Sequence, residues 1–214
     1  MLSNMNTVLI FCAHSDDEAI GVGGTIAKYV AEKKDVIKVV FSHGEKSIPH
    51  LQEEVVKKAR LQETDAASAF IGIKETICLG LKDTKLKSEV QQPTVIRRVK
   101  KLILQYKPEK IYVPSALDPH PDHQAVNGVV LQIVDSLSKH YPVYAYEVWN
   151  VVKETHPRVY VDVSLYMKKK LTYIRMFKSQ WGYMFLLYLP TLFRSIVYGR
   201  KNGCTYAERF YKIR

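Results

Sequence analysis

The sequence predicts an α/β fold: a Rossmann-like, mainly parallel sheet flanked by helices in a single domain. Short apolar runs of β-type residues alternate with amphipathic segments over the first two-thirds of the chain, the pattern of a doubly wound sheet. A length of 214 residues suits one large domain, and no stretch has the composition of a linker, so we expect residues 1–214 to form one unit. Polar, chemistry-bearing residues also follow two predicted strands, where such sheets bind ligands.

The first predicted strand, residues 7–13, is an unbroken apolar run that we expect to be buried. A helix is predicted over 17–32, because apolar residues recur there at helical spacing. A second strand covers 36–41. A long helix follows over 52–70, with Gly72 just past its end as a stop signal.

The alternation continues with a short strand at 76–79 and a helix at 94–105, which follows a proline. A fourth strand covers 110–115. Residues 122–139 carry Val, Leu and Ile three to four positions apart, which predicts another helix. These strand–helix pairs indicate a parallel sheet with helical crossovers.

After residue 139 the rhythm changes. Residues 142–149 and 158–163 predict consecutive strands, and 166–179 predict a basic helix. The remainder, from residue 180, is aromatic, and we expect it to be irregular.

The formal charge of +11 at pH 7 favours anionic partners: phosphate-bearing substrates, a membrane surface or nucleic acid. No nucleic-acid recognition motif accompanies the charge, so we expect no nucleic-acid partner; most lysine clusters are explained by solvated helix faces. Contact with a membrane surface and homo-oligomerisation both stay open. The apolar stretch 181–193 is too short to span a bilayer, which takes about 20 residues, but it could lie on a lipid interface.

The three cysteines indicate the compartment. Cys12, Cys78 and Cys204 lie far apart and form no CxxC pair, so neither a disulfide framework nor a thiolate metal site is expected. The first apolar run ends at His14 and has no positively charged segment before it, so we expect no signal peptide. We therefore expect a cytoplasmic protein, with peripheral attachment to a membrane left open.

His14, Asp16 and Asp17 stand at the junction between the first strand and the first helix. Helix capping explains one aspartate at such a junction, but less easily two carboxylates and an imidazole. Together with His123, His14 and Asp17 make a His/Asp/His set with an open position, the pattern of a catalytic zinc site; Fe²⁺ also suits these ligands. Asp16 is then free to act as a general base on a metal-activated water.

His120 and His123 follow the fourth predicted strand, in Asp-Pro-His-Pro-Asp-His. A solvated surface loop is the simpler explanation of this segment alone, but the first site lacks a third ligand that His123 can supply. We expect His120 to lie over the open position, where an imidazolium could stabilise an oxyanion and protonate a leaving amine. Asp122 either orients an imidazole or caps the following helix, and the sequence does not separate these roles.

Two further patterns are weaker. Gly21-Val-Gly-Gly24 lacks the third glycine of a dinucleotide-binding loop and comes inside the predicted helix, so close helix–sheet contact explains it better. Arg60 and Glu63 are one turn apart on a helix; they either form an exposed ion pair, or Arg60 binds an anionic or hydroxylated substrate.

At this point the chain resembles a known family. Ala13-His-Ser-Asp-Asp-Glu18 is similar to the AHPDDE signature of the LmbE-like, or PIG-L, N-acetylglucosaminyl deacetylases, with Ser15 in place of proline. Asp118–His123 is similar to that family's second metal motif. Further matches are the glycine pair at 23–24, Arg60-x-x-Glu63, and Tyr206-Ala-Glu-Arg-Phe210.

The resemblance implies a Rossmann-like fold with one zinc ion held by His14, Asp17 and His123. It also implies Asp16 as general base, His120 as the oxyanion-stabilising acid, and hydrolysis of the N-acetyl group of a glucosamine-type sugar with release of acetate. Two rival functions stay open: a metal-dependent hydrolase of another amide or a phosphoester, and a basic, non-catalytic protein that binds a membrane surface.

Overall fold

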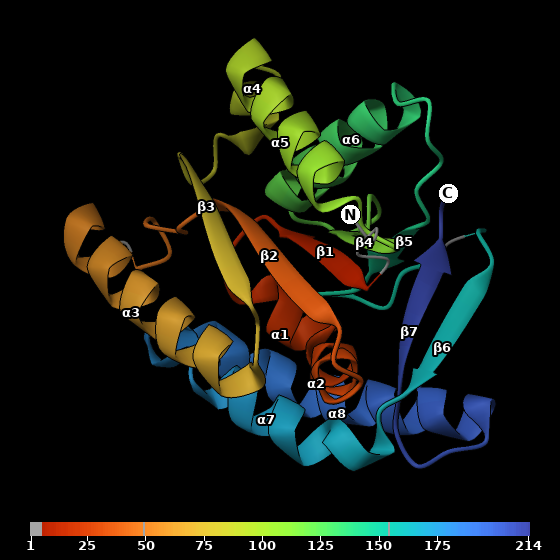
Figure 1. Cartoon of the computed structure of the whole chain (residues 1–214). Coiled ribbons are helices and arrows are strands. Elements are labelled where there is room, and N and C mark those ends of the chain that lie inside the picture. Colours follow the sequence, from red (N-terminus) through yellow and green to blue (C-terminus); the bar gives the residue numbers. More distant parts are fainter. Residues whose placement is uncertain (1–5, 49, 154) are drawn as a thin grey trace.

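The computed structural model describes residues 6–48, 50–153 and 155–214, and its centre is a single sheet (Figure 1). In the described part of the chain this sheet has seven strands, in the order β3-β2-β1-β4-β5-β7-β6. The strands are β1 (Thr7–Cys12), β2 (Asp35–Ser42), β3 (Glu75–Leu81), β4 (Lys110–Pro114), β5 (Val143–Tyr146), β6 (Arg158–Asp162) and β7 (Ala207–Lys212). Neighbours from β3 to β5 are parallel, and β7 runs antiparallel to both β5 and β6. The predicted α/β class and mainly parallel sheet are confirmed.

The strand order reverses beside β1. This strand pairs in parallel with β2 on one side and with β4 on the other, where Leu9 lies opposite Ile111. The chain therefore leaves the carboxyl ends of β1 and β4 side by side, and the loops that follow them open onto one crevice. In an open α/β sheet such a crevice is the usual place for a ligand.

Helices cover both faces of the sheet (Figure 1). The helices α4, α5 and α6 lie on one face, and α1, α2, α3, α7 and α8 lie on the other. Their bounds are α1 (Asp17–Gly21), α2 (Gly23–Ala31), α3 (Glu53–Ile71), α4 (Leu86–Glu89), α5 (Pro93–Tyr106), α6 (Pro121–Asp135), α7 (Met167–Arg175) and α8 (Trp181–Asn202), with short 3₁₀ turns at Ser164–Tyr166 and Lys178–Gln180.

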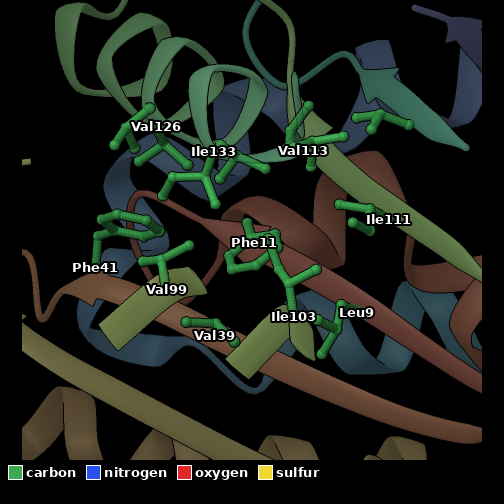
Figure 2. Close-up of a cluster of buried hydrophobic side chains, with 14 of the residues drawn as sticks. Leu9, Phe11, Val39, Phe41, Val99, Ile103, Ile111, Val113, Val126 and Ile133 are labelled. Atoms are coloured by element: carbon green, nitrogen blue, oxygen red, sulfur yellow. The ribbon is translucent and has the colours of Figure 1, made fainter. Parts of the chain in front are cut away.

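The buried core has two parts because β1 is covered on both faces. Leu9 and Phe11 point to the side of α5 and α6, where Figure 2 shows them among the side chains of those helices. Ile10 and Cys12 alternate with them and pack on the other face. A strand buried on both faces is apolar at every position, which explains the unbroken run in the sequence.

The predicted helix over 17–32 is two helices. Val22 ends α1 and begins α2, with φ −132° and ψ 0°. Gly21, the last residue of α1, packs closely beside this break, because a Cβ there would lie 2.3 Å from the Tyr146 ring. Lys170 Nζ donates a hydrogen bond to the carbonyl oxygen of Ile20 beside the break, at 2.7 Å. The glycines thus serve close packing, as the sequence suggested.

The expectation of an irregular carboxyl-terminal part was wrong. Residues 181–202 form α8, the longest helix described, with Pro190 inside it, and residues 207–212 form β7. Helix prediction from sequence needs a polar face to alternate with an apolar one, and the solvent-facing side of α8 is itself apolar over its first three turns. The preceding helix, predicted over 166–179, ends at Arg175.

Element ends also differ from the prediction. The helix predicted over 122–139 ends at Asp135, and the strand predicted over 142–149 covers only Val143–Tyr146. The short α4 was not predicted. Such differences leave the topology unchanged.

Strand β7 ties the carboxyl-terminal part to the helices beside the crevice. Glu208 accepts hydrogen bonds from the backbone N–H groups of Gly24, at 2.8 Å, and Thr25, at 2.7 Å, in the first turn of α2. Its Oε1 also lies 2.6 Å from Nζ of Lys170 in α7. A carboxylate on a helix amino terminus is favourable, because it satisfies N–H groups that lack partners within the helix. Glu208 therefore joins β7, α2 and α7.

Candidate active site

Asp17 lies at the centre of the buried polar cluster beyond β1. It is the first residue of α1, and its Oδ2 accepts a hydrogen bond from the backbone N–H of His14 at 2.8 Å. Its Oδ1 lies 3.1 Å from Nε2 of His123 and 3.9 Å from Nδ1 of His14. One carboxylate oxygen thus faces two imidazole nitrogens that come from segments more than a hundred residues apart in the chain.

His123 enters this cluster from the first turn of α6 and is fully buried. Its other ring nitrogen, Nδ1, lies 2.9 Å from Oδ1 of Asp118. Asp118 is itself held by the backbone N–H groups of His120, at 3.0 Å, and Trp149, at 3.1 Å. The orientation of the His123 ring is therefore fixed from both sides.

His14 is held in the same way. Its Nε2 lies 3.1 Å from Asp83 and 3.4 Å from Asp122. Asp122 also accepts hydrogen bonds from the backbone N–H groups of Thr84, at 2.9 Å, and Leu86, at 3.3 Å. Asp122 therefore contacts an imidazole and also holds the amino-terminal end of α4, whereas the sequence had posed orientation and capping of its own helix as alternatives.

The carboxylates set the charge of both imidazoles. Burial opposes protonation of His14, but hydrogen bonds with Asp122 and Asp83 raise its pKa to about 10. Burial likewise opposes protonation of His123, whose pKa the charge of Asp17 raises to about 9. Burial raises the pKa of Asp17, but the charge of His123 outweighs this effect and holds that pKa well below its usual range. Each imidazole is therefore surrounded by groups that also favour a bound cation in place of its proton.

His14, Asp17 and His123 fit a metal ion. One donor atom from each lies within 4.8 Å of the others, and all three residues are buried. Two imidazoles and one carboxylate are a typical donor set of catalytic zinc. The second nitrogen of each imidazole faces a carboxylate, the arrangement that orients metal-binding histidines. The cluster can hold a divalent cation without rearrangement of the fold.

Asp16 stands beside this cluster and takes no part in it. It precedes α1, and its side chain is 17% exposed, whereas that of Asp17 is 4% exposed. Arg60 of α3 reaches it, with Nη2 3.4 Å from Oδ1. Arg60 is itself buried beneath Gly44, where a Cβ would lie 2.9 Å from the guanidinium carbon. Asp16 is therefore a carboxylate held by a guanidinium and open to the crevice.

The structure excludes an exposed ion pair between Arg60 and Glu63. Arg60 is 3% exposed and faces Asp16, and Glu63 instead accepts hydrogen bonds from the backbone N–H and the hydroxyl of Ser179, both at 2.7 Å. Glu63 thus ties α3 to the segment that leads into α8.

His120 is the N-cap of α6. Its Nδ1 accepts a hydrogen bond from the backbone N–H of Asp122 at 3.2 Å, which leaves the proton of the ring on Nε2. Burial lowers the pKa of His120, and the charges of His14 and His123 lower it further. Its ring centroid lies 5.0 Å from that of His14 and 4.8 Å from that of His123. This environment favours a neutral imidazole, whereas the sequence interpretation assigned an imidazolium.

The loop that carries these groups is tied down by buried polar contacts. Ser15, which replaces the proline of the signature, pairs its hydroxyl with that of Thr64 in α3. Glu18 is fully buried and accepts hydrogen bonds from Lys38 Nζ at 2.9 Å and from the hydroxyl of Tyr173 at 2.5 Å. These contacts hold the loop around Ser15 in place, at the position where the AHPDDE signature has a rigid proline.

A pocket of about 340 Å³ opens over the cluster. One side, the polar wall, consists of His14, Asp16, Asp17, Arg60, Asp83 and His120. A second group of lining residues, the apolar wall, consists of Val148, Trp149, Tyr183, Met184 and Leu187. The Trp149 and Tyr183 rings meet edge to face, with centroids 6.3 Å apart. The pocket can therefore take a small ligand that has a polar reacting end and a face for aromatic contact.

The structure brings all six predicted site residues together: five line the pocket, and His123 lies directly beneath it. Sequence reasoning missed Asp83 and the apolar wall. Asp83 could have been found from its position two residues beyond β3, at the same edge of the sheet as the other strand ends. The apolar wall carries no such signal, because Trp149 and the α8 residues resemble ordinary core residues in the sequence.

Comparison with known proteins identifies relatives of the chain. The family model described as PIG-L, GlcNAc-PI de-N-acetylase, matches residues 9–134. A diacetylchitobiose deacetylase of Thermococcus kodakarensis is 26% identical over 96% of this chain and 82% of its own length. A probable N-acetyl-α-D-glucosaminyl L-malate deacetylase of Bacillus cereus is 30% identical over 62% of each chain.

Solved structures share the fold. N,N′-diacetylchitobiose deacetylase from Pyrococcus horikoshii has a TM-score of 0.82 at 24% identity, over 96% of this chain and 82% of that one. GalB, a 4-carboxy-2-hydroxymuconate hydratase from Pseudomonas putida, has a TM-score of 0.83 at 21% identity, over 98% of this chain and 97% of that one. One fold thus carries two chemistries, so the fold alone does not assign an activity. The match over more than half of the chain, with both motifs at adjacent strand ends, shows that the chain belongs to the PIG-L family.

Proposed function

We propose that the protein is a metal-dependent deacetylase that hydrolyses the N-acetyl group of a glucosamine-type sugar or glycoconjugate. The observation that carries this proposal is Asp16, a carboxylate that lines the pocket outside a set of three groups that could hold a metal ion. The relatives named as deacetylases of N-acetylated amino sugars support the substrate class. In this proposal residues 1–214 form one deacetylase domain, and the pocket lining, which draws on residues from His14 to Leu187, supports this.

His14, Asp17 and His123 hold the metal in this proposal, with Zn²⁺ expected and Fe²⁺ as the alternative. Such an ion supplies a lower pKa for the attacking water and polarisation of the acetyl carbonyl. Asp118, Asp83 and Asp122 keep the two imidazoles in position.

Asp16 accepts the proton of the attacking water as the water oxygen bonds to the acetyl carbon. The bond from that carbon to nitrogen then breaks, the carbonyl reforms, and Asp16 returns the proton to the leaving nitrogen. The products are acetate and a free amine, with no other reactant consumed. Arg60 holds the Asp16 side chain at the pocket through the contact of its Nη2 with Oδ1.

His120 donates a hydrogen bond from Nε2 to the oxyanion of the tetrahedral intermediate. Its Nδ1 is occupied by the N–H of Asp122, so the neutral ring is already oriented for this task. The imidazolium suggested by the sequence would have to give up that hydrogen bond. A neutral donor also adds no further positive charge beside the cation that His14 and His123 would hold; the ring centroids of both lie about 5 Å from that of His120.

The substrate's sugar ring is expected on the apolar wall, where Trp149 and Tyr183 offer aromatic faces. Hydroxyl groups of the sugar can reach Arg60, and Lys46 and Gln180 at the pocket lining provide further donors. The pocket of about 340 Å³ suits one sugar ring, and further parts of a conjugate must lie outside it.

The test measures acetate release from N-acetylated amino sugars in free, lipid-linked and oligomeric form, with bound metal quantified in the same sample. The control variant is Asp16→Asn, which keeps the shape of the side chain and removes the base. We expect it to retain metal and to lose at least about a hundredfold in rate. Acetate release at the wild-type rate from Asp16→Asn would contradict the mechanism.

The same panel tests the second candidate, a metal-dependent hydrolase of a phosphoester or another amide. The formal charge of +11 favours phosphate-bearing substrates, and the donor set serves either reaction. Phosphate release from a small phosphoester without acetate release from any amino sugar would replace the deacetylase proposal with this one.

A further inference from the structure

One side of α8 carries large apolar side chains in solvent. These side chains, the α8 apolar face, are between 40% and 68% exposed, and they come from a helix of 22 residues. The α8 apolar face consists of Trp181, Tyr183, Phe185, Leu186, Leu189 and Phe193. Isolated exposed apolar residues are normal on a protein surface, but six within thirteen positions of one helix indicate a surface that binds something.

The opposite side of the same helix is well buried. Met184, Leu187 and Thr191 are between 2% and 7% exposed and alternate with the exposed positions at helical spacing. Met184 and Leu187 also line the pocket. The helix is therefore fixed to the domain by one side, and its apolar outer side is a feature of the folded protein.

Positive charge is concentrated around this helix. Residues 163–207 contain eight lysines and arginines and no aspartate or glutamate, which is most of the chain's formal net charge of +11. Arg175 of α7 lies over the ring of Tyr188 in α8, with its guanidinium carbon 5.2 Å from the ring centroid. The exposed cations of this segment are Lys168, Arg175, Lys178, Arg200 and Lys201.

Two occupants could cover an apolar face of this kind: a lipid surface or a second copy of the chain. A second copy packed face to face would bring the cations of two α7–α8 segments together, with no acidic residue in either segment to pair with them. An anionic bilayer offers both complements, acyl chains for the aromatic and aliphatic side chains and negative headgroups for the flanking cations. The charge therefore favours the bilayer.

We propose that the α8 apolar face docks the protein on anionic membrane surfaces, with the flanking lysines and arginines on the lipid headgroups. No helix in the described residues is long and apolar enough to cross a membrane, so α8 would lie in the plane of the interface. Tyr183 belongs to both the α8 apolar face and the pocket lining, so docking brings the pocket next to the lipid surface.

This docking does not depend on the deacetylase proposal. The two proposals meet at one consequence: a docked enzyme would reach an N-acetylated amino sugar carried by a lipid more readily than the same sugar in solution. That consequence rests on the proposed function, whereas membrane binding itself can be measured with no substrate present.

The experiment compares co-sedimentation of the whole protein with phosphatidylcholine vesicles and with vesicles that also contain phosphatidylglycerol. The test variant combines Phe185→Gln, Leu186→Gln, Leu189→Gln and Phe193→Gln, none of which lines the pocket. The matched control is Leu104→Gln, an exposed leucine of α5 on the opposite face of the sheet (Figure 1). We expect wild type and control to bind the anionic vesicles, and the test variant to bind more than about tenfold more weakly.

A second pair of variants tests the charge. Lys201→Gln, at the end of α8, is expected to weaken binding to anionic vesicles about fivefold at low salt, since one lysine near such a surface contributes about 1 kcal/mol. Lys101→Gln, which removes an exposed lysine of α5, should have little effect. High salt should also weaken the binding of wild type to anionic vesicles, because it screens the attraction between the lysines and the headgroups.

The outcomes separate the occupants. Wild type that ignores both kinds of vesicle overturns the proposal, and so does equal binding by wild type and the four-residue variant. A self-associated wild type that becomes monomeric in the four-residue variant, without vesicle binding, would assign the face to a second copy. Acetate release from a soluble substrate should be the same in wild type and in this variant, so loss of docking and failure of the proposed function are distinguishable.

Discussion

The two walls of the pocket differ in how the fold builds them. Apart from Arg60 of α3, the polar wall stands at the carboxyl ends of parallel strands, and its imidazoles and carboxylates are held by hydrogen bonds with the backbone and with each other. The apolar wall comes from the loop after β5 and from α8, and it is held by packing. The strand ends hold the imidazoles and carboxylates in fixed positions through hydrogen bonds. The packed helix α8 instead gives the pocket an apolar surface of a certain shape.

This difference separates chemistry from recognition. Groups that bind a metal or move a proton must keep their positions closely, so they stand on rigid strand ends. A wall that contacts the rest of the substrate can change its side chains without disturbing the reaction. Substitutions in the polar wall should therefore abolish turnover, and those in the apolar wall should change substrate binding.

The largest effect is expected from His123→Ala. His123 is fully buried and supplies one of three metal-binding atoms, so its loss should remove the metal and with it more than about a thousandfold of the activity. Metal content by elemental analysis and acetate release on the same preparation measure both. A variant that keeps its metal and its activity would show that His123 is not a ligand.

Glu208→Ala should cost the most stability. It would leave the Lys170 ammonium in a buried site with the carbonyl of Ile20 as its remaining described partner, and breaking a buried pair in this way costs about 3–5 kcal/mol. Lys170→Met should cost less, because Glu208 keeps the N–H groups of Gly24 and Thr25. Denaturant unfolding measures both variants. Equal losses of unfolding free energy in the two variants would contradict the expectation that an unpaired Lys170 ammonium costs more than an unpaired Glu208 carboxylate.

His120→Ala tests a polar-wall residue that is not expected to bind the metal. His120 supplies no metal-binding atom in the proposed set, so the metal should stay bound. Loss of one oxyanion donor typically costs about 10²–10³ in kcat. His120→Asn, which can still donate a hydrogen bond, should recover part of the rate. Loss of metal from His120→Ala would show that the division of roles between His120 and His123 is wrong.

Sequence reasoning predicted the polar wall except Asp83, because two short motifs at strand ends carry most of it. His14 and His123 each follow a strand, and the carboxyl ends of parallel strands share one edge of the sheet. The charge state of His120 was not predictable, because it depends on a hydrogen bond to Asp122 and on two imidazoles that come close only in the folded chain.

The apolar wall and α8 were missed for a physical reason. A surface helix is recognised by the contrast between its two sides, and the first three turns of α8 are apolar on both. Pro190 adds a local signal against a helix at a position where the fold still accommodates it. The apolar outer side that hid this helix from prediction is the surface for which we propose membrane docking.

The smallest effect is expected from Trp149→Ala in the apolar wall. The Trp149 side chain lines the pocket and meets Tyr183. Its link to the buried polar cluster is the hydrogen bond from its backbone N–H to Asp118, which the substitution leaves intact. Metal content and kcat should therefore be unchanged, and KM should rise about five- to thirtyfold through loss of aromatic contact worth about 1–2 kcal/mol. Trp149→Phe should restore most of the binding. A fall in kcat with unchanged KM would show that the apolar wall takes part in the chemistry, and the separation between the two walls would then fail.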